Sequence, residues 1–283
     1  MRYGFIFPGG DARTLAELSR EAEEAGWDGV FIPDCIDIDN GNSALPAGFD
    51  PWVTLAAMAM RTERVRLGAI VTPPSRRRPW KLARETMTLD HLSNGRLIVA
   101  VGLGALDDGA FGKVGEATDL KTRAEMLDEG LAILAGLWSG QPFGFHGTHY
   151  RMDAMTFQPP IQSPRIPVWV VGAWPRMKSM RRALRWDGIL PQKSGGPDAA
   201  MTPADIATMY AFIEAERGDT TPYDIITEGE TPGDDPERAA AIVRPLAAAG
   251  ATWWMETRWV GQLGPEEIRT RLRQGPPRVA EEF

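Results

Sequence analysis

Cysteine and histidine are scarce in this chain of 283 residues, which contains one cysteine and three histidines. Because Cys35 is the single cysteine, no disulfide within the chain can stabilise the fold. His146 and His149 have a spacing that could in principle bind a metal, but no pattern of carboxylates or cysteines accompanies them. We therefore expect no metal site.

A long apolar run is also missing. No stretch approaches the roughly 18 apolar residues of a membrane-spanning helix, and the apolar part of the N-terminal MRYGFIFPGG is too short for a signal peptide. The net charge of −7 argues against a nucleic-acid binder, which would show a basic stripe. The short basic clusters at 76–78 and 181–182 are expected to be solvated surface. We expect a cytoplasmic protein that binds neither membranes nor nucleic acids.

One stretch, from Arg78 to Gly104, shows the repeating unit of the chain: RPWKLARETMTLDHLSNGRLIVAVGLG. Pro79 suits the first turn of a helix, because its missing N–H would have no partner there. Asn94 and Gly95 end the helix, since both tolerate a positive φ. The run 97–101 is apolar on both faces, as expected of a buried parallel strand. The stretch therefore predicts a helix, a tight turn and a strand that ends in glycines.

Similar units recur along the whole chain, so the sequence predicts one (β/α)8 TIM barrel domain over residues 1–283. The length is close to the roughly 250 residues of such barrels. A doubly wound open sheet is the alternative, but Phe7-Pro8-Gly9-Gly10 is no phosphate-binding fingerprint after the first strand. An insertion after strand four, residues 105–165, is expected to act as a lid and to contain short strands around 143–145 and 150. The main strands are expected at 2–7, 29–32, 65–71, 97–101, 167–171, 188–190, 223–227 and 251–257.

The active site of a barrel lies at the carboxyl ends of its strands, where this chain has apolar, aromatic and glycine residues and few titratable groups. Such a surface suits a flat cofactor better than hydrolytic chemistry. No Gly-x-Ser-x-Gly motif is present, which argues against a serine hydrolase of that type. The run from Gly102 to Asp107 lacks the third glycine of a dinucleotide fingerprint.

Two sites remain as candidates. Asp34 could hydrogen-bond a cofactor or substrate and Cys35 could line the pocket; equally, Asp34 could cap a turn and Cys35 could be a small buried apolar residue. The loop QKSGG, from Gln192 to Gly196, could hold a phosphate with its lysine, serine and free backbone N–H groups. A flexible surface loop is the alternative there.

The chain resembles the bacterial luciferase-like family of flavin- and deazaflavin-dependent oxidoreductases. The resemblance rests on LAELSREAEEAGWDGVFIPD, DPWVTLAAMAMRTERVRLGAIV and LARETMTLDHLSNGRLIVAVGLG, followed in order by RAEMLDEGLAILAGLWSG, FQPPIQSPRIPVWVVGAW and DGILP. It implies a barrel that binds FMN or coenzyme F420 across its strand ends, and a cis peptide at Ile70–Val71. The cofactor-binding residues that it implies are Phe7, Ile70, Val71, Thr72, Gly102, Gly104, Gly172, Ala173, Trp174, Gln192, Lys193 and Ser194.

Two departures leave the cofactor open between FMN and F420. Many F420-dependent members have Asp-His after strand two, whereas this chain has Asp34-Cys35, and a thiol replaces imidazole poorly as an acid near neutral pH. Members that bind FMN often have an arginine beside the strand-four glycines, where this chain has Leu103.

The resemblance implies an oxidoreductase that acts on paired donors. With FMNH2, supplied by a separate flavin reductase, it would be a monooxygenase; with F420 it would transfer hydride. Its substrate would be a small, partly hydrophobic molecule, given the aromatic residues Phe7, Trp52, Phe111 and Trp174. The alternatives are a flavin-binding protein with little catalysis and an unrelated barrel enzyme such as a lyase. A homodimer is the expected assembly, because dimers are common in the family.

Overall fold

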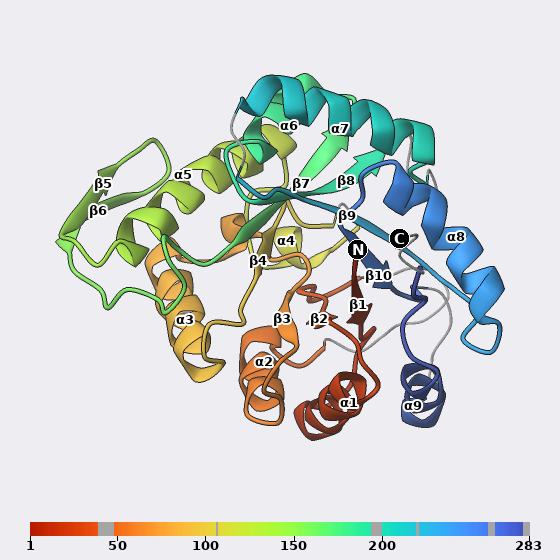
Figure 1. Ribbon diagram of the computed structural model, residues 1–283. Helices are drawn as coiled ribbons and strands as arrows, with labels where there is room; N and C mark the ends of the chain where they lie inside the picture. Colours follow the sequence, from red (N-terminus) through yellow and green to blue (C-terminus); the bar gives the residue numbers. More distant parts are fainter. Residues whose placement is uncertain (39–47, 106, 194–199, 219–220, 260–263, 280–283) are drawn as a thin grey trace.

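A closed barrel of parallel strands forms the centre of the protein. The computed structural model describes residues 1–38, 48–105, 107–193, 200–218, 221–259 and 264–279, and within them eight parallel strands follow the order β3-β2-β1-β10-β9-β8-β7-β4. Parallel bridges of Leu67 with Leu97 and of Thr72 with Val101 join the two edge strands. The predicted (β/α)8 barrel is therefore confirmed (Figure 1). Its strands are β1 (Arg2–Ile6), β2 (Gly29–Ile32), β3 (Arg66–Ala69), β4 (Val99–Val101), β7 (Val168–Trp174), β8 (Gly188–Lys193), β9 (Asp224–Gly229) and β10 (Trp253–Glu256).

Helices connect these strands and surround the barrel (Figure 1). Aspartates start four of the described helices, because the carboxylates of Asp11, Asp50, Asp119 and Asp235 accept hydrogen bonds from backbone N–H groups of the first helical turn. None of the described helices has the length and apolar character needed to cross a membrane. The helices are α1 (Ala12–Glu24), α2 (Pro51–Ala59), η1 (Pro74–Arg76), α3 (Pro79–Leu92), α4 (Ala110–Lys113), α5 (Leu120–Trp138), α6 (Met177–Ala183), α7 (Pro203–Arg217), α8 (Pro236–Ala248) and α9 (Pro265–Arg273).

Some element boundaries differ from the predicted ones. Strand β3 ends at Ala69 instead of residue 71, just before the Ile70–Val71 peptide, which is cis as predicted. Strand β8 continues to Lys193, three residues beyond the prediction, because Pro191, Gln192 and Lys193 pair with the last residues of β7. The helix end at Asn94 and Gly95 is confirmed, with φ values of 55° and 76°.

The interior of the barrel is filled by aromatic and aliphatic side chains. Phe31 stacks on Trp169 at 5.6 Å between ring centroids, and Trp169 meets the edge of Trp253 at 5.3 Å. Gly29 makes room for these rings, since a Cβ there would lie 2.8 Å from the ring of Phe31. A second, larger apolar cluster fills the layer between the barrel and the helices. Side chains of successive strand residues alternate between these two layers.

The insertion between β4 and β7 contains a hairpin of β5 (Phe143–His146) and β6 (Arg151–Met155), which confirms the short strands predicted there. Its turn is bound to α5, because the carboxylate of Glu129 accepts hydrogen bonds from the backbone N–H groups of residues 148–150 at 2.7–3.0 Å. The role of residues 105–165 as a lid stays a prediction. Within this insertion, the hairpin is the part that lies outside the barrel, beyond α5 (Figure 1).

A buried guanidinium fixes the turn before β3 to the turn before β4. Arg96 donates five hydrogen bonds of 2.7–3.0 Å, to the carbonyl oxygens of Ala59, Thr62, Val65 and Ser93 and to Thr62 Oγ1. Its side chain thereby satisfies carbonyl groups that the end of α2 leaves without helical partners. This contact holds β3 and β4 in register where the barrel closes.

We expect Arg96→Met to destabilise the fold by about 2–4 kcal/mol, because it leaves several buried acceptors without donors. Urea unfolding followed by circular dichroism measures this loss. Arg84→Met is the matched control, since Arg84 is exposed on α3, and should change stability by less than about 0.5 kcal/mol. Equal stabilities of the two variants would contradict the assigned role of Arg96.

Candidate functional site

The inward-facing residues at the carboxyl ends of β3, β4 and β7 form a small apolar surface. A Cβ at Gly102 would lie 2.9 Å from Cγ2 of Val171 and 3.5 Å from Cγ2 of Val71, so the valines pack directly against the backbone of Gly102 and leave no room for a side chain there. Val71, Val171 and Leu190 are each half-buried. Ala173 of β7 pairs with Gln192 of β8, two residues beyond the pair of Val171 with Leu190, so both residues face the same side of the sheet as these. The structure therefore brings together the predicted residues Ile70, Val71, Gly102, Ala173 and Gln192.

This surface fits a planar ring system with polar edges. Its floor is apolar and lacks a side chain at Gly102, as close approach of a flat group requires. Thr72 lies at the same strand end, and its buried Oγ1 has no hydrogen-bond partner among the described residues. Its bridge partner Val101 belongs to the outer cluster, so the Thr72 side chain faces that layer and its contact with a cofactor stays a prediction.

Three other predicted cofactor-binding residues lie on the side of the chain that faces the outer layer. Phe7 is fully buried and packs against Phe5, with 5.3 Å between ring centroids. Trp174 belongs to the same outer cluster. A Cβ at Gly172 would lie 2.4 Å from Cδ1 of Ile189, which is also part of that cluster. If these three residues border a cofactor, as predicted, they can do so only through their backbone atoms.

Gly104 also remains a predicted position, and its conformation explains why glycine occurs there. Its φ is +84°, and a Cβ would lie 2.6 Å from Cζ of Phe111. Glycine therefore lets Phe111 pack directly against the end of β4.

Asp34 lies in a buried ion-pair network rather than as a free carboxylate. Its oxygens accept hydrogen bonds from Arg77 Nη2 at 2.9 and 2.8 Å, and Arg76 Nη2 donates to Oδ1 at 3.3 Å. Arg76 also binds Asp108, and we call Asp34, Arg76, Arg77 and Asp108 the Arg76 network. The expectation that 76–78 is solvated surface is wrong for Arg76, whose side chain is 5% exposed, and for the largely buried Arg77. It is also wrong for Arg182, which is buried against Asp128.

Asp108 connects this network to the segment after β4. Its carboxylate accepts hydrogen bonds from the backbone N–H groups of Ile36, Asp37 and Ala110 at 3.0–3.2 Å. Burial by itself would raise the pKa of Asp108, but hydrogen bonds from Arg76 and these N–H groups outweigh it and hold the pKa below its usual value. The ends of β2 and β3 are thus tied to residues 108–110.

Two guanidinium groups lie over the ring of Phe111. The Arg76 guanidinium carbon is 4.9 Å from the centroid of the Phe111 ring, and that of Arg123 is 3.5 Å from it. Such cation–π contacts are strongest where water is excluded, and Phe111 is buried. Together with the Arg76 network they hold α4 beside the strand ends.

Cys35, the other predicted catalytic residue, is half-buried beside this network. Burial and the negative charges of Asp108 and Asp34 raise the pKa of the Cys35 thiol. The thiol is therefore protonated at neutral pH, which makes it a poor nucleophile. Its proposed role in catalysis remains a prediction.

The predicted phosphate loop is described only at its start. Lys193 Nζ lies 2.8 Å from Oδ2 of Asp205, at the start of α7. Hydrogen bonds from Lys193 and Thr202 lower the pKa of Asp205 to about 2. Lys193 would have to share its charge between Asp205 and a phosphate. Ser194 and the rest of the loop to residue 199 lie outside the described residues.

Glu228 is a site residue that the sequence analysis missed. It ends β9 and follows the inward-facing Ile226 by two residues, so it points to the inside of the barrel mouth. Glu228 keeps an exposed surface, yet the protein around it removes enough water to raise the pKa of its carboxyl, and a hydrogen bond from Trp259 offsets this in part. A single glutamate forms no sequence motif. The alternation of inward- and outward-facing residues along β9 is the signal that would have identified Glu228.

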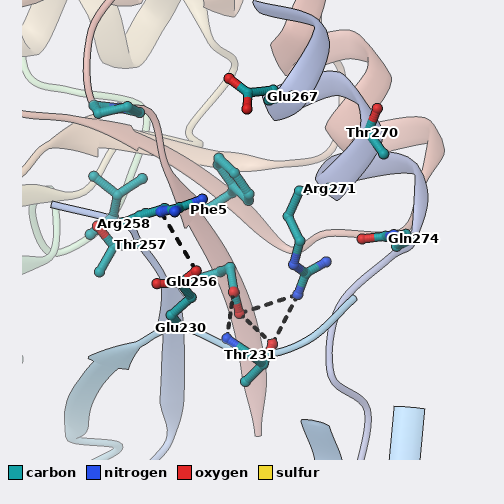
Figure 2. A pocket seen from close by; sticks show the side chains of 12 residues that line it. Phe5, Glu230, Thr231, Glu256, Thr257, Arg258, Glu267, Thr270, Arg271 and Gln274 are labelled. Carbon is teal, nitrogen blue, oxygen red and sulfur yellow. Dashed lines mark hydrogen bonds and ion pairs between the residues drawn. The ribbon is translucent and has the colours of Figure 1, made fainter. Parts of the chain in front are cut away.

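A cavity of about 280 Å³ lies beside the mouth, between α9 and the ends of β1 and β10. Figure 2 shows Glu256 at its base, where the carboxylate accepts hydrogen bonds from the backbone N–H and the hydroxyl of Thr231 at 2.8 and 2.7 Å. Arg271 of α9 lies 3.2 Å from the same carboxylate. Because Glu256 is fully bonded, its side chain anchors α9 to the barrel. No cluster of three or more histidine, cysteine or acidic residues suited to a metal occurs in the described part of the chain.

Comparison with known proteins places this site in context. The family model for luciferase-like monooxygenases matches residues 5–279. An F420-dependent glucose-6-phosphate dehydrogenase of Nakamurella multipartita is 34% identical over 188 residues, which cover 65% of this chain and 53% of that protein. An uncharacterized protein of Mycobacterium tuberculosis is 32% identical over 188 residues, covering 61% of this chain and 65% of its own length. The chain thus matches only about half to two thirds of the length of these relatives.

Two solved structures share the whole fold. The monooxygenase RslO1 from Streptomyces bottropensis has a TM-score of 0.77 at 20% identity, with 97% of each chain covered. The coenzyme F420 dependent tetrahydromethanopterin reductase from Methanopyrus kandleri has a TM-score of 0.75 at 18% identity, covering 97% of this chain and 98% of its own. At these identities the comparison shows the fold alone.

We expect Arg76→Met to destabilise the protein by about 3–5 kcal/mol, because it leaves the buried carboxylates of Asp34 and Asp108 without their shared cation. Chemical denaturation measures the loss. Arg78→Met, at an exposed neighbour, is the control and should cost less than about 0.5 kcal/mol. When Arg76→Met and Asp108→Asn are combined, the loss in the free energy of unfolding should be smaller than the sum of the two single losses. A loss equal to that sum would show that the two groups do not interact.

The depressed pKa of Asp108 predicts a pH effect on stability. A carboxyl whose pKa is lower in the folded than in the unfolded state stabilises the fold above its unfolded pKa, near 3.9, and that stabilisation is lost as the pH falls through the folded pKa. Between pH 4 and pH 2 the wild type should therefore lose more stability than Asp108→Asn. Parallel slopes of unfolding free energy against pH in the two proteins would rule out this contribution.

Proposed function

Because the chain belongs to the luciferase-like monooxygenase family, we propose that it is an oxidoreductase that binds FMN or F420 across its strand ends. The observation that carries this proposal is the apolar surface that Val71, Val171 and the backbone of Gly102 form at the carboxyl ends of β3, β4 and β7, because glycine lets the valines pack close together into a low surface on which a flat ring could lie. The carboxyl ends of the strands are where barrel enzymes bind their ligands.

F420 is the first candidate for the cofactor. The named curated relatives, such as the Nakamurella protein at 34% identity, are F420-dependent. Leu103 stands where FMN-binding members often have an arginine, and its carbonyl oxygen accepts a weak hydrogen bond from Arg123 at 3.5 Å. Bound F420 supplies a hydride acceptor or donor. Hydride transfer to or from F420 needs no metal ion.

The residues of this chain would bind and orient the cofactor and keep water away. Val71, Gly102 and Val171 would contact its ring. Lys193 would attract its phosphate. The Arg76 network and Phe111 hold the segment after β4 in place, which restricts access of solvent from that side.

We further propose that the substrate is a small, partly hydrophobic molecule with a hydroxyl-bearing carbon, or the corresponding carbonyl compound. The surface beside Gly102 is apolar, while the polar groups on its rim are Gln192 and Glu228. A dehydrogenase reaction on such a carbon is in keeping with the relatives that are named F420-dependent glucose-6-phosphate dehydrogenases.

An FMN-dependent monooxygenase is the second candidate. A 3,6-diketocamphane monooxygenase component in complex with FMN has the same fold, with a TM-score of 0.61 at 19% identity. In that case a separate flavin reductase would supply FMNH2. A homodimer is proposed for either case on the family resemblance.

The first experiment is an anaerobic titration of the purified full chain with F420, FMN and FMNH2, followed by quenching of tryptophan fluorescence. We expect F420 to bind more tightly than both flavins. Tighter binding of FMNH2 would instead favour the monooxygenase. If none of the three binds, the proposed function is wrong.

The same titration tests the ring site through Gly102→Ala. We expect a dissociation constant at least tenfold higher than that of the wild type, because the added methyl would displace Val171 from the surface that meets the ring. Gly112→Ala is the control: Gly112 is exposed on α4, its Cβ would make an ordinary 3.8 Å contact with Thr118, and affinity should not change. Equal affinities in both variants would place the ring elsewhere.

A further inference from the structure

Three acidic side chains near the carboxyl ends of barrel strands differ in how they are bonded. Asp34, after β2, is bound by two arginines. Glu256, at the end of β10, is bonded by Thr231, Trp254 and Arg271 and faces the outer layer. Glu228, at the end of β9, receives one hydrogen bond, from the indole of Trp259, and the described residues supply no cation to it.

The position of Glu228 follows from the register of its strand. Ile225 belongs to the outer cluster and Ile226 to the inner one, so Glu228 lies on the inner side. It pairs with Met255 of β10, which is also an inner residue. Glu228 is therefore an exposed carboxyl that faces the same mouth as the surface around Gly102.

The charged groups on the neighbouring elements are engaged elsewhere. On β8, Lys193 is paired with Asp205. After β10, Arg258 lies 3.7 Å from Glu230, and the arginines that follow β3 bind Asp34. At the far end of β9, the carboxylate of Asp224 accepts hydrogen bonds from Trp169 and Thr252. Desolvation thus acts on Glu228 without a compensating positive charge, and the pKa of its carboxyl rises.

We propose that Glu228 is the acid–base residue of this site, which takes the hydroxyl proton of the substrate during oxidation and returns it during reduction. The inference rests on the proposed hydride-transfer function. In the oxidation the substrate loses its C–H hydride to oxidised F420 and its O–H proton to the Glu228 carboxylate, and the C–O bond becomes a carbonyl. The proton then leaves to water. A carboxyl whose pKa is shifted toward the working pH suits both directions.

The protonation state of Glu228 can be measured without cofactor, because Trp259 reports on it. Intrinsic fluorescence of the wild type should change with pH above the ordinary range of a glutamate, and that transition should vanish in Glu228→Gln and in Trp259→Phe. Glu230→Gln is the matched control, since Glu230 is an exposed glutamate two residues away, and should keep the transition. A transition that persists in Glu228→Gln, or is absent from the wild type, would overturn the inference.

Catalysis is then tested with F420 and three probes: 2-propanol, cyclohexanol and glucose 6-phosphate. For a probe that the wild type oxidises, kcat of Glu228→Gln should fall about 10²–10⁴-fold, while the F420 dissociation constant stays within about threefold. The wild-type kcat/KM should rise with pH through the fluorescence transition, because the base must be ionised, and the variant should lack this rise. An unchanged kcat and pH profile in the variant overturns the inference. A wild type that binds no F420 overturns the proposed function instead, and the fluorescence titration separates the two failures.

Discussion

The buried guanidinium of Arg76 is the contact on which the geometry of the mouth depends. It binds Asp34 after β2 and Asp108 after β4 from its own place after β3, and its face lies on Phe111. Three segments far apart in sequence therefore meet at one cation. Burying these charges is costly, so the arrangement is stable only while all partners are present. That requirement favours one position of the segment after β4 over the alternatives that an uncharged contact would tolerate.

The repeating helix–strand unit made most of the fold predictable. Buried parallel strands are apolar on both faces, and capping aspartates, prolines and glycines mark the helix ends, so local sequence carries the information. Strand ends were less predictable, since β8 extends to Lys193 through pairing with β7, a long-range contact. The cis peptide at Ile70–Val71 came from the family resemblance and would not have followed from the residues themselves.

The candidate site was predictable in its place but not in its details. The resemblance marked whole strand ends, yet alternation sends Gly102 and Ala173 inward and Gly172 and Trp174 outward. Applying that alternation to β9 would also have identified Glu228. The burial of Arg76 could not have been predicted, because its two aspartate partners lie about 30 to 40 positions away in the chain. An arginine triplet looks the same in sequence whether it is solvated or paired.

The presence of a cysteine, Cys35, at the end of β2 has a physical consequence for the site. A half-buried thiol with a raised pKa stays neutral, so the end of β2 offers no group that exchanges protons near neutral pH. The oxygens of the neighbouring Asp34 are held by Arg76 and Arg77. In a closed barrel, however, all strand ends face one mouth, and a proton-exchanging group can be supplied from any of them. Glu228, on β9, has the properties of such a group: it is accessible, inward-facing and unpaired with any described cation. The mouth thus combines a neutral thiol and a paired carboxylate at the end of β2 with an accessible carboxyl at the end of β9.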